Sequence, residues 1–174
     1  MRFDIIESEC VFEGKVFNVR LDRVRLPNGH TGRIDVIEHR GAVTVVPIDE
    51  AGQVWFVRQH RHPAGEDLLE LPAGVMDHGE DPAFSAQREL REEIGMAANQ
   101  LTPLGEFFLA PGYSTEFMHV FLAYQLHPEP LQPDDDEQIE IVKIPVSELP
   151  GLVKAGQIRD AKSLAALYLW QIAG

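Results

Sequence analysis

The segment from residue 74 to residue 96, GVMDHGEDPAFSAQRELREEIGM, constrains the fold of this chain more than any other part of the sequence. It carries the signals that start and end one helix over residues 82–94. Asp81 is a good N-cap, and Pro82 suits the first helical position, where its missing N–H is not needed. Gly95 provides a C-terminal stop. An apolar stripe at helical spacing is formed by Ala83, Ala86, Leu90 and Ile94. The segment therefore predicts a helix that packs one face against a core.

The predicted helix also concentrates negative charge. Glu89, Glu92 and Glu93 lie three and four positions apart, which places them on one side of the helix. Like charges at this spacing destabilise an isolated helix, so another group must offset their repulsion. A divalent cation is one such group, because Mg²⁺ takes carboxylate oxygens and shares its coordination shell with substrate phosphates. The alternative is an ordinary solvated helix with a charged face, which is the commoner meaning of a charge run.

The complete pattern resembles the Nudix box. It runs Gly74, five residues, Glu80, seven residues, then Arg88-Glu89-Leu90-x-Glu92-Glu93-x-Gly95-Met96, with every defining position filled. In the Nudix family this box forms a loop–helix–loop that holds metal for hydrolysis of a nucleoside diphosphate linked to a further group. The resemblance implies an enzyme with the Nudix fold: an α/β/α sandwich with a mixed sheet, plus a small N-terminal β region.

Carried over position by position, the resemblance also implies roles for individual residues. Glu89 and Glu93 are expected to bind metal, and Glu92 to bind it or to support the ligands. Arg88 lies one turn before Glu92 and is expected to pair with it, which leaves Glu89 and Glu93 for the metal. The carbonyl of Ala73 is a further candidate ligand. Mg²⁺ is the expected ion, with Mn²⁺ as a substitute, because metal ions neutralise phosphate oxygens and activate the attacking water.

Two segments outside the box resemble the ADP-ribose pyrophosphatase subgroup. Pro111 lies fifteen residues beyond Met96 and opens a PG-x-[ST]-x-E run that ends at Glu116, although Pro before Gly also marks an ordinary turn. The resemblance makes Pro111 and Glu116 candidate substrate contacts, and Glu116 is also a candidate metal or water contact. The VRQHR segment that ends at Arg61 resembles a VRQ-x-R motif. An arginine fork suits a diphosphate, so Arg61 is a candidate substrate ligand. Arg33 is a weaker one, based on its place in an N-terminal hairpin.

A loop rich in acidic residues supplies the candidate general base. In this subgroup a mobile acidic loop before the last long strand carries that base, and Glu137, or failing that Asp135, falls in the matching place. Glu137 is also a candidate metal ligand. Taken alone, an acidic loop is most often solvated chain. A base must reach a water beside the metal, so geometry has to decide between the two residues.

The resemblance implies that ADP-ribose is hydrolysed to AMP and ribose 5-phosphate. Another nucleoside diphosphate sugar, such as GDP-mannose, is the nearest alternative, because the residues that read the base cannot be placed from one sequence. A more distant alternative is a sensor that binds ADP-ribose without turnover. Such sensors usually carry an added DNA-binding domain and a damaged box, whereas this chain keeps every box carboxylate.

Composition limits the other functions. The 174 residues include 28 acidic residues against 15 lysines and arginines, a net charge of −13. This excess argues against a general nucleic-acid or membrane-surface binder. Cys10 is the only cysteine, so an internal disulfide is excluded. The mixed, polar start MRFDIIESEC shows no leader or long apolar run, and a cytoplasmic location is therefore expected.

Hydrophobic patterning predicts the remaining elements. Strands are expected at residues 4–12, 16–26, 33–39, 43–48, 54–59, 119–126 and 140–144, and closing helices at 146–155 and 160–172. A turn at Pro27-Asn28-Gly29 indicates a hairpin between the second and third strands. We expect residues 1–40 to form an N-terminal β region and residues 41–174 a Nudix hydrolase domain. Members of the subgroup are commonly homodimers that exchange the N-terminal strands, and the thin hairpin is compatible with that.

Overall fold

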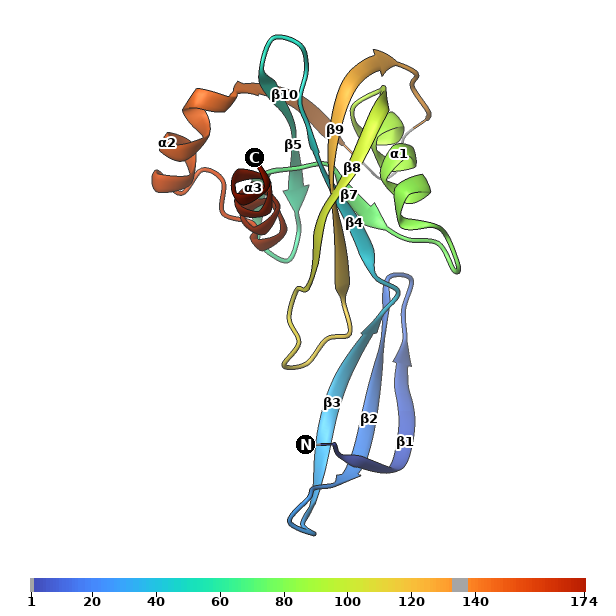
Figure 1. Cartoon of the computed structure of the whole chain (residues 1–174). Helices are drawn as coiled ribbons and strands as arrows, with labels where there is room; N and C mark the ends of the chain where they lie inside the picture. The colour runs from blue at the N-terminus through green and yellow to red at the C-terminus, as the bar shows by residue number, and fades with distance from the viewer. Residues whose placement is uncertain (1, 133–137) are drawn as a thin grey trace.

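The computed structural model describes residues 2–132 and 138–174. The N-terminal part is an antiparallel three-stranded sheet of β1 (Asp4–Glu13), β2 (Phe17–Arg25) and β3 (Thr31–His39). This sheet extends away from the rest of the molecule (Figure 1). The predicted hairpin is present: the N–H of Leu26 donates to the carbonyl of His30 at 2.8 Å, and Gly29 adopts a left-handed φ of 84° in the turn.

Two further sheets form the centre of the molecule. The four-stranded sheet has the order β7 (Ala73–Val75), β4 (Ala42–Pro47), β9 (Phe117–Pro128) and β8 (Met96–Phe108). Only β4 and β9 run parallel in it, so the sheet is mixed, as predicted. The other sheet is antiparallel, with the order β10 (Ile139–Pro145), β5 (Gln53–Arg61) and β6 (Glu66–Glu70).

Helices cover the central sheets on two sides, as Figure 1 shows for α1 (Pro82–Glu93) and α3 (Ala161–Ala173). Alternate residues of β4 face opposite layers. Val43 and Val45 are fully buried in a cluster with Leu90 of α1, while Val46 is fully buried in a second cluster with Ala166 of α3. This is the period-two alternation of a strand between two layers. The predicted α/β/α sandwich is therefore confirmed.

Most of the elements expected from the sequence are present, but the segment 146–155 differs, and the strands β6, β7 and β8 were not predicted. The expected helix over residues 146–155 is a 3₁₀ turn, Val146–Glu148, followed by the short helix α2 (Leu149–Lys154). The long strand β8 was not predicted, because its sequence MAANQLTPLGEFF is rich in residues with low strand propensity. Pairing with β9 holds it in the sheet, with an irregularity between Pro103 and Gly105.

Within residues 2–132 and 138–174, no helix is long and apolar enough to cross a membrane.

Candidate active site

The local signals of the box build α1 as predicted. The carboxylate of Asp81 accepts hydrogen bonds from the N–H groups of Ala83, at 2.9 Å, and Phe84, at 3.2 Å, and thereby caps the helix. The helix ends at Glu93, and Gly95 takes a left-handed φ of 68°. The predicted apolar stripe is wrong at one position: Ala83, in the first turn of the helix, is exposed.

Two acidic side chains of α1 are buried on the face that meets β7. Glu89 is 7% exposed and Glu93 is 5% exposed, whereas Glu92 is half-buried. The backbone N–H of Ala73 donates to Oε2 of Glu93 at 3.0 Å. The carboxylate of Glu89 lies so close to Gly74 that a Cβ atom there would overlap it. The Ala73–Gly74 backbone is thus in contact with both carboxylates.

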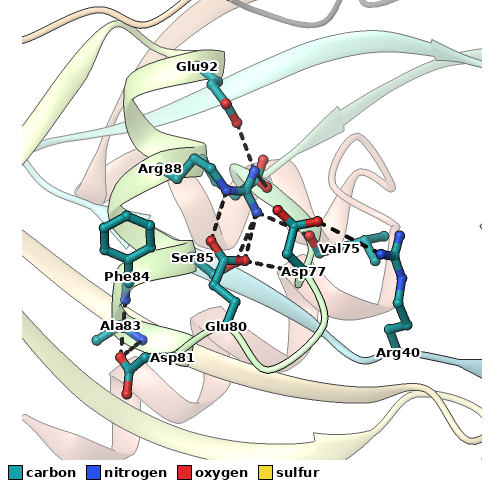
Figure 2. Close-up of polar contacts among 11 residues, drawn as sticks. Arg40, Val75, Asp77, Glu80, Asp81, Ala83, Phe84, Ser85, Arg88 and Glu92 are labelled. Carbon is teal, nitrogen blue, oxygen red and sulfur yellow. Dashed lines mark hydrogen bonds and ion pairs between the residues drawn. The ribbon is translucent and has the colours of Figure 1, made fainter.

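Arg88 joins the acidic residues of the box (Figure 2). Its Nη1 group donates to Glu89 at 2.6 Å and to Glu92 at 2.9 Å. Its Nε and Nη2 groups donate to the two oxygens of Glu80, at 3.0 and 3.1 Å, and Nη2 also donates to the carbonyl of Val75 at 3.2 Å. The expected pairing with Glu92 is present. However, the expectation that Arg88 leaves Glu89 unpaired is wrong, because the same Nη1 group reaches both carboxylates.

These contacts stabilise the charged forms of the residues involved. The hydrogen bonds from Arg88 are the largest cause that lowers the pKa of Glu80, from 4.5 to about 2. In return, the hydrogen bond to Glu80 is the largest of the effects that raise the pKa of Arg88. Glu80 also accepts a hydrogen bond from the backbone N–H of Asp77 at 2.9 Å. The ion pair between Glu80 and Arg88 therefore connects the loop before the helix to the helix itself.

The donors on this face fit a divalent metal ion. Glu89 and Glu93 are one helical turn apart and buried, and carboxylate and backbone carbonyl oxygens are the donors that hard divalent cations prefer. Residues 2–132 and 138–174 contain no preformed cluster of three His, Cys, Asp or Glu side chains at metal-binding distance. Besides Glu89 and Glu93, the candidate donors are the carbonyl of Ala73 and the half-buried Glu92, while Glu137 lies outside the described residues.

A second charged cluster lies at the end of β5. The Nε and Nη2 groups of Arg61 donate to the two oxygens of Glu70 at 2.9 and 2.7 Å. Lys162 of α3 donates to the same carboxylate, which is 1% exposed. Burial alone would raise the pKa of Glu70, but the hydrogen bonds and charges of Arg61 and Lys162 bring it below its usual value. Sequence reasoning missed Glu70 and Lys162 as partners; the signal was an acidic residue between apolar Leu69 and Leu71.

The remaining predicted residues are distributed around the fold. Arg33 is exposed on β3, opposite Arg23 of β2, and thus belongs to the N-terminal sheet and not to the α1 site. Pro111 is exposed in a turn that also contains Tyr113, whose carbonyl accepts from the N–H of Ile37 of β3 at 2.7 Å.

Glu116 is half-buried just before β9, and its N–H donates to Oγ of Ser114 at 3.1 Å. Both candidate bases, Asp135 and Glu137, lie outside the described residues.

Comparisons with known proteins place this geometry in a family. The NUDIX domain family model matches residues 38–167, and the nucleoside diphosphate sugar hydrolase N-terminal domain model matches residues 4–33. The chain is 36% identical to an ADP-ribose pyrophosphatase of Bacillus subtilis (strain 168) over 169 residues, 96% of this chain and 91% of the relative. It is 37% identical to an ADP-ribose pyrophosphatase of Mycobacterium tuberculosis over 168 residues, 95% of this chain and 81% of the relative.

A solved structure described as an ADP compounds hydrolase superposes with a TM-score of 0.88 at 28% sequence identity, covering 98% of this chain and 93% of that one. The family match spans the box helix, both central sheets and most of α3. The chain therefore belongs to the NUDIX family, as its box sequence predicted.

Proposed function

We propose that this protein hydrolyses the diphosphate of ADP-ribose to AMP and ribose 5-phosphate with the help of Mg²⁺. The observation that carries the proposal is the contact of two buried carboxylates, Glu89 and Glu93, with the backbone at Ala73–Gly74. Arg88 is a single positive charge shared among Glu80, Glu89 and Glu92, so the carboxylates of the box outnumber their cation and a divalent metal ion would offset the remaining negative charge. The two relatives named as ADP-ribose pyrophosphatases support the choice of substrate.

Each residue of the box has its own task in this proposal. Glu89 and Glu93, with the carbonyl of Ala73 and with Glu92 as ligand or support, would hold the metal. A bound divalent metal supplies charge neutralisation at the phosphate oxygens and lowers the pKa of a coordinated water. Arg88 fixes the positions of Glu89, Glu92 and the loop through Glu80. Glu137, or failing that Asp135, would accept the proton of the attacking water.

Substrate contacts would come from outside the helix. Arg61 presents a guanidinium at the end of β5, with its side chain 41% exposed, and is the candidate ligand for the diphosphate. Pro111 and Glu116 lie in the segment between β8 and β9, and Arg33 lies on β3. We propose Pro111 and Glu116 as further substrate contacts and Arg33 as a weaker phosphate ligand; the turn that contains Pro111 is joined to β3 by the hydrogen bond from the N–H of Ile37 to the carbonyl of Tyr113.

The N-terminal region is proposed to serve dimerisation. Residues 1–40 would form this region and residues 41–174 the catalytic domain. The N-terminal sheet exposes large apolar side chains, among them Ile5, Phe12 and Phe17, which is unusual unless a partner covers them.

Light scattering should give the mass of a homodimer for the parent and of a monomer for the Ile5→Asp/Phe12→Asp protein. Val153→Asp, which changes an exposed apolar residue of α2, is the matched control and should leave the mass unchanged.

The reaction is tested by a turnover assay with ADP-ribose and Mg²⁺ in which AMP is identified as the product. The parent should turn over rapidly, and Glu93→Gln should lose on the order of a thousandfold in kcat, because a weakened metal site would no longer neutralise the phosphate oxygens or activate the attacking water. Glu148→Gln, at an exposed site on the 3₁₀ turn, is the matched control and should retain the activity of the parent.

Different results would redirect the proposal in defined ways. Slow turnover of ADP-ribose with rapid turnover of GDP-mannose would retain the metal site and change the substrate. Replacement of Mg²⁺ by Mn²⁺ with equal or higher activity would change the preferred ion only. Tight binding of ADP-ribose without hydrolysis of any diphosphate sugar would overturn the enzymatic proposal and favour a sensor.

A further inference from the structure

We propose that Glu70 and Lys162 are positioning residues, which hold the guanidinium of Arg61 where it can bind the diphosphate beside the acidic face of α1. The inference rests on the proposed function, since Glu70 and Lys162 are assigned the role of holding Arg61, the candidate ligand of the diphosphate. Neither residue is expected to touch the substrate itself. Together they would link the C-terminal helix α3 to substrate binding at the end of β5.

The pair between Arg61 and Glu70 has a fixed geometry. Two parallel hydrogen bonds, from Nε at 2.9 Å and from Nη2 at 2.7 Å, fix the plane of the guanidinium and not only its position. Glu70 is the fixed partner, because its side chain is 2% exposed while that of Arg61 is 41% exposed. A guanidinium has more N–H donors than these two bonds use, so it can hold Glu70 and a phosphate at the same time.

Helix α3 contacts the Glu70 carboxylate through Lys162. Lys162 donates to Oε2 of Glu70 and, at 3.0 Å, to Oδ1 of Asp160. Asp160 is the N-cap of α3 and accepts from the N–H groups of Lys162, at 3.1 Å, and Ser163, at 3.2 Å. The Lys162 side chain is only 13% exposed. The ammonium is therefore held by the first turn of α3, and it donates to the same Oε2 atom of Glu70 that accepts from Nη2 of Arg61.

Lys162 also changes the charge balance at Arg61. If Arg61 alone faced Glu70, the buried carboxylate would offset much of its positive charge. Lys162 supplies a second positive charge, so Arg61 and Lys162 together face the carboxylates of Glu70 and Asp160; without Lys162 the guanidinium would face both carboxylates alone and lose attraction for an anionic substrate. Glu93 is among the charges that act on Arg61 and raise its pKa, after the hydrogen bond to Glu70. Glu70 also lies three residues before Ala73, whose N–H donates to Glu93 at 3.0 Å, so one short segment connects the partner of Arg61 to a candidate metal ligand.

The test compares Lys162→Met, Lys162→Arg and the exposed control Lys154→Met. Steady-state kinetics with ADP-ribose and Mg²⁺ give KM and kcat, and calorimetry with ADP-ribose in EDTA gives a Kd that does not depend on turnover. Lys162→Met should raise KM and Kd by about tenfold with kcat changed by less than about threefold, because the loss falls on substrate binding. Lys162→Arg should restore most of the affinity, and Lys154→Met should match the parent.

The same substitution in an Arg61→Ala background separates positioning from general stability. If Lys162 acts through Arg61, Lys162→Met should weaken binding of ADP-ribose little further once Arg61 is absent. Equal losses in both backgrounds, or an unchanged Kd in Lys162→Met, would overturn the positioning role. If Lys162→Met does not fold, Lys162→Gln with its melting temperature takes its place under the same criteria.

Failure of the underlying function would look different. A parent protein that neither binds nor hydrolyses ADP-ribose would overturn the proposed function and this inference together. An active parent in which Lys162→Met retains full affinity would overturn only the positioning role and leave the reaction intact.

Discussion

The carboxylate of Glu89 lies against the backbone of Gly74, in the space that a Cβ atom would occupy at any other residue type. Gly74 does not need its glycine for the backbone conformation, since its φ is not among the positive values. Glycine is needed there because the absence of a Cβ atom lets the backbone of β7 approach the carboxylate of Glu89 closely. The glycine that opens the box is therefore a requirement of packing between β7 and α1, and substitution should displace one of the two buried carboxylates.

Gly74→Ala should reduce turnover by at least about tenfold, because a shift of Glu89 alters the geometry of the acidic face. The control is Gly151→Ala in α2, where an added Cβ meets nothing within 4 Å. That variant should keep the parent activity and gain slightly in stability from the helix propensity of alanine. Activity of Gly74→Ala equal to that of the control would contradict the prediction.

Arg88→Met should destabilise the protein by about 2–4 kcal/mol, since it leaves Glu80, Glu89 and Glu92 without their shared cation. Arg88→Lys should recover only part of this loss, because an ammonium cannot reproduce the paired bonds to Glu80. Urea denaturation of the three proteins gives the free energies of unfolding. If the Arg88→Lys variant is as stable as the parent, the paired hydrogen bonds from the guanidinium to Glu80 do not contribute to stability.

Glu80 gives a prediction about pH. Because its pKa is lowered from 4.5 to about 2, chiefly by hydrogen bonds from Arg88, the folded protein favours the charged carboxylate. The stabilisation is fully present above pH 4.5 and is lost as the pH falls towards about 2. The free energy of unfolding of the parent should therefore fall more steeply over this range than that of Glu80→Gln. Parallel curves for the two proteins would contradict the pairing of Glu80 with Arg88.

Ser163→Ala should cost about 1–3 kcal/mol, because the buried N–H of Leu71 would lose its acceptor. That hydrogen bond, 2.8 Å long, connects α3 to the chain between β6 and β7. Ser147→Ala, at an exposed position, is the control and should change the melting temperature little. Thermal unfolding of the two variants beside the parent distinguishes a structural hydrogen bond from a general effect of removing a hydroxyl.

Helix α1 and its caps could be predicted because their signals are local. Asp81, Pro82 and Gly95 act on backbone groups within a few residues, so the sequence of the segment contains the signals that start and end the helix. The strand β8 could not be predicted in the same way. Its own residues have weak strand propensity, and its hydrogen-bond partner β9 begins only after the Pro111 turn.

In the candidate site, too, some features could be predicted from the sequence and others depend on packing. The spacing of Glu89 and Glu93 within one helix predicts that they share a face, and both are buried on the face that meets β7. The sharing of Arg88 between Glu89 and Glu92 was not predictable, because side-chain spacing allows several pairings and only the packed structure selects among them. The candidate bases Glu137 and Asp135 remain predictions from sequence.

The sequence by itself determined the family, the box helix and the chemical character of its acidic face, because each depends on residues close together in the chain. Only the tertiary structure decided which partners these residues meet. The Glu89 carboxylate lies against Gly74 because α1 packs on β7, and Lys162 contacts Glu70 from 92 positions away in the sequence. Contacts of that kind follow from how sheets and helices pack in three dimensions, and no periodicity along one segment contains them.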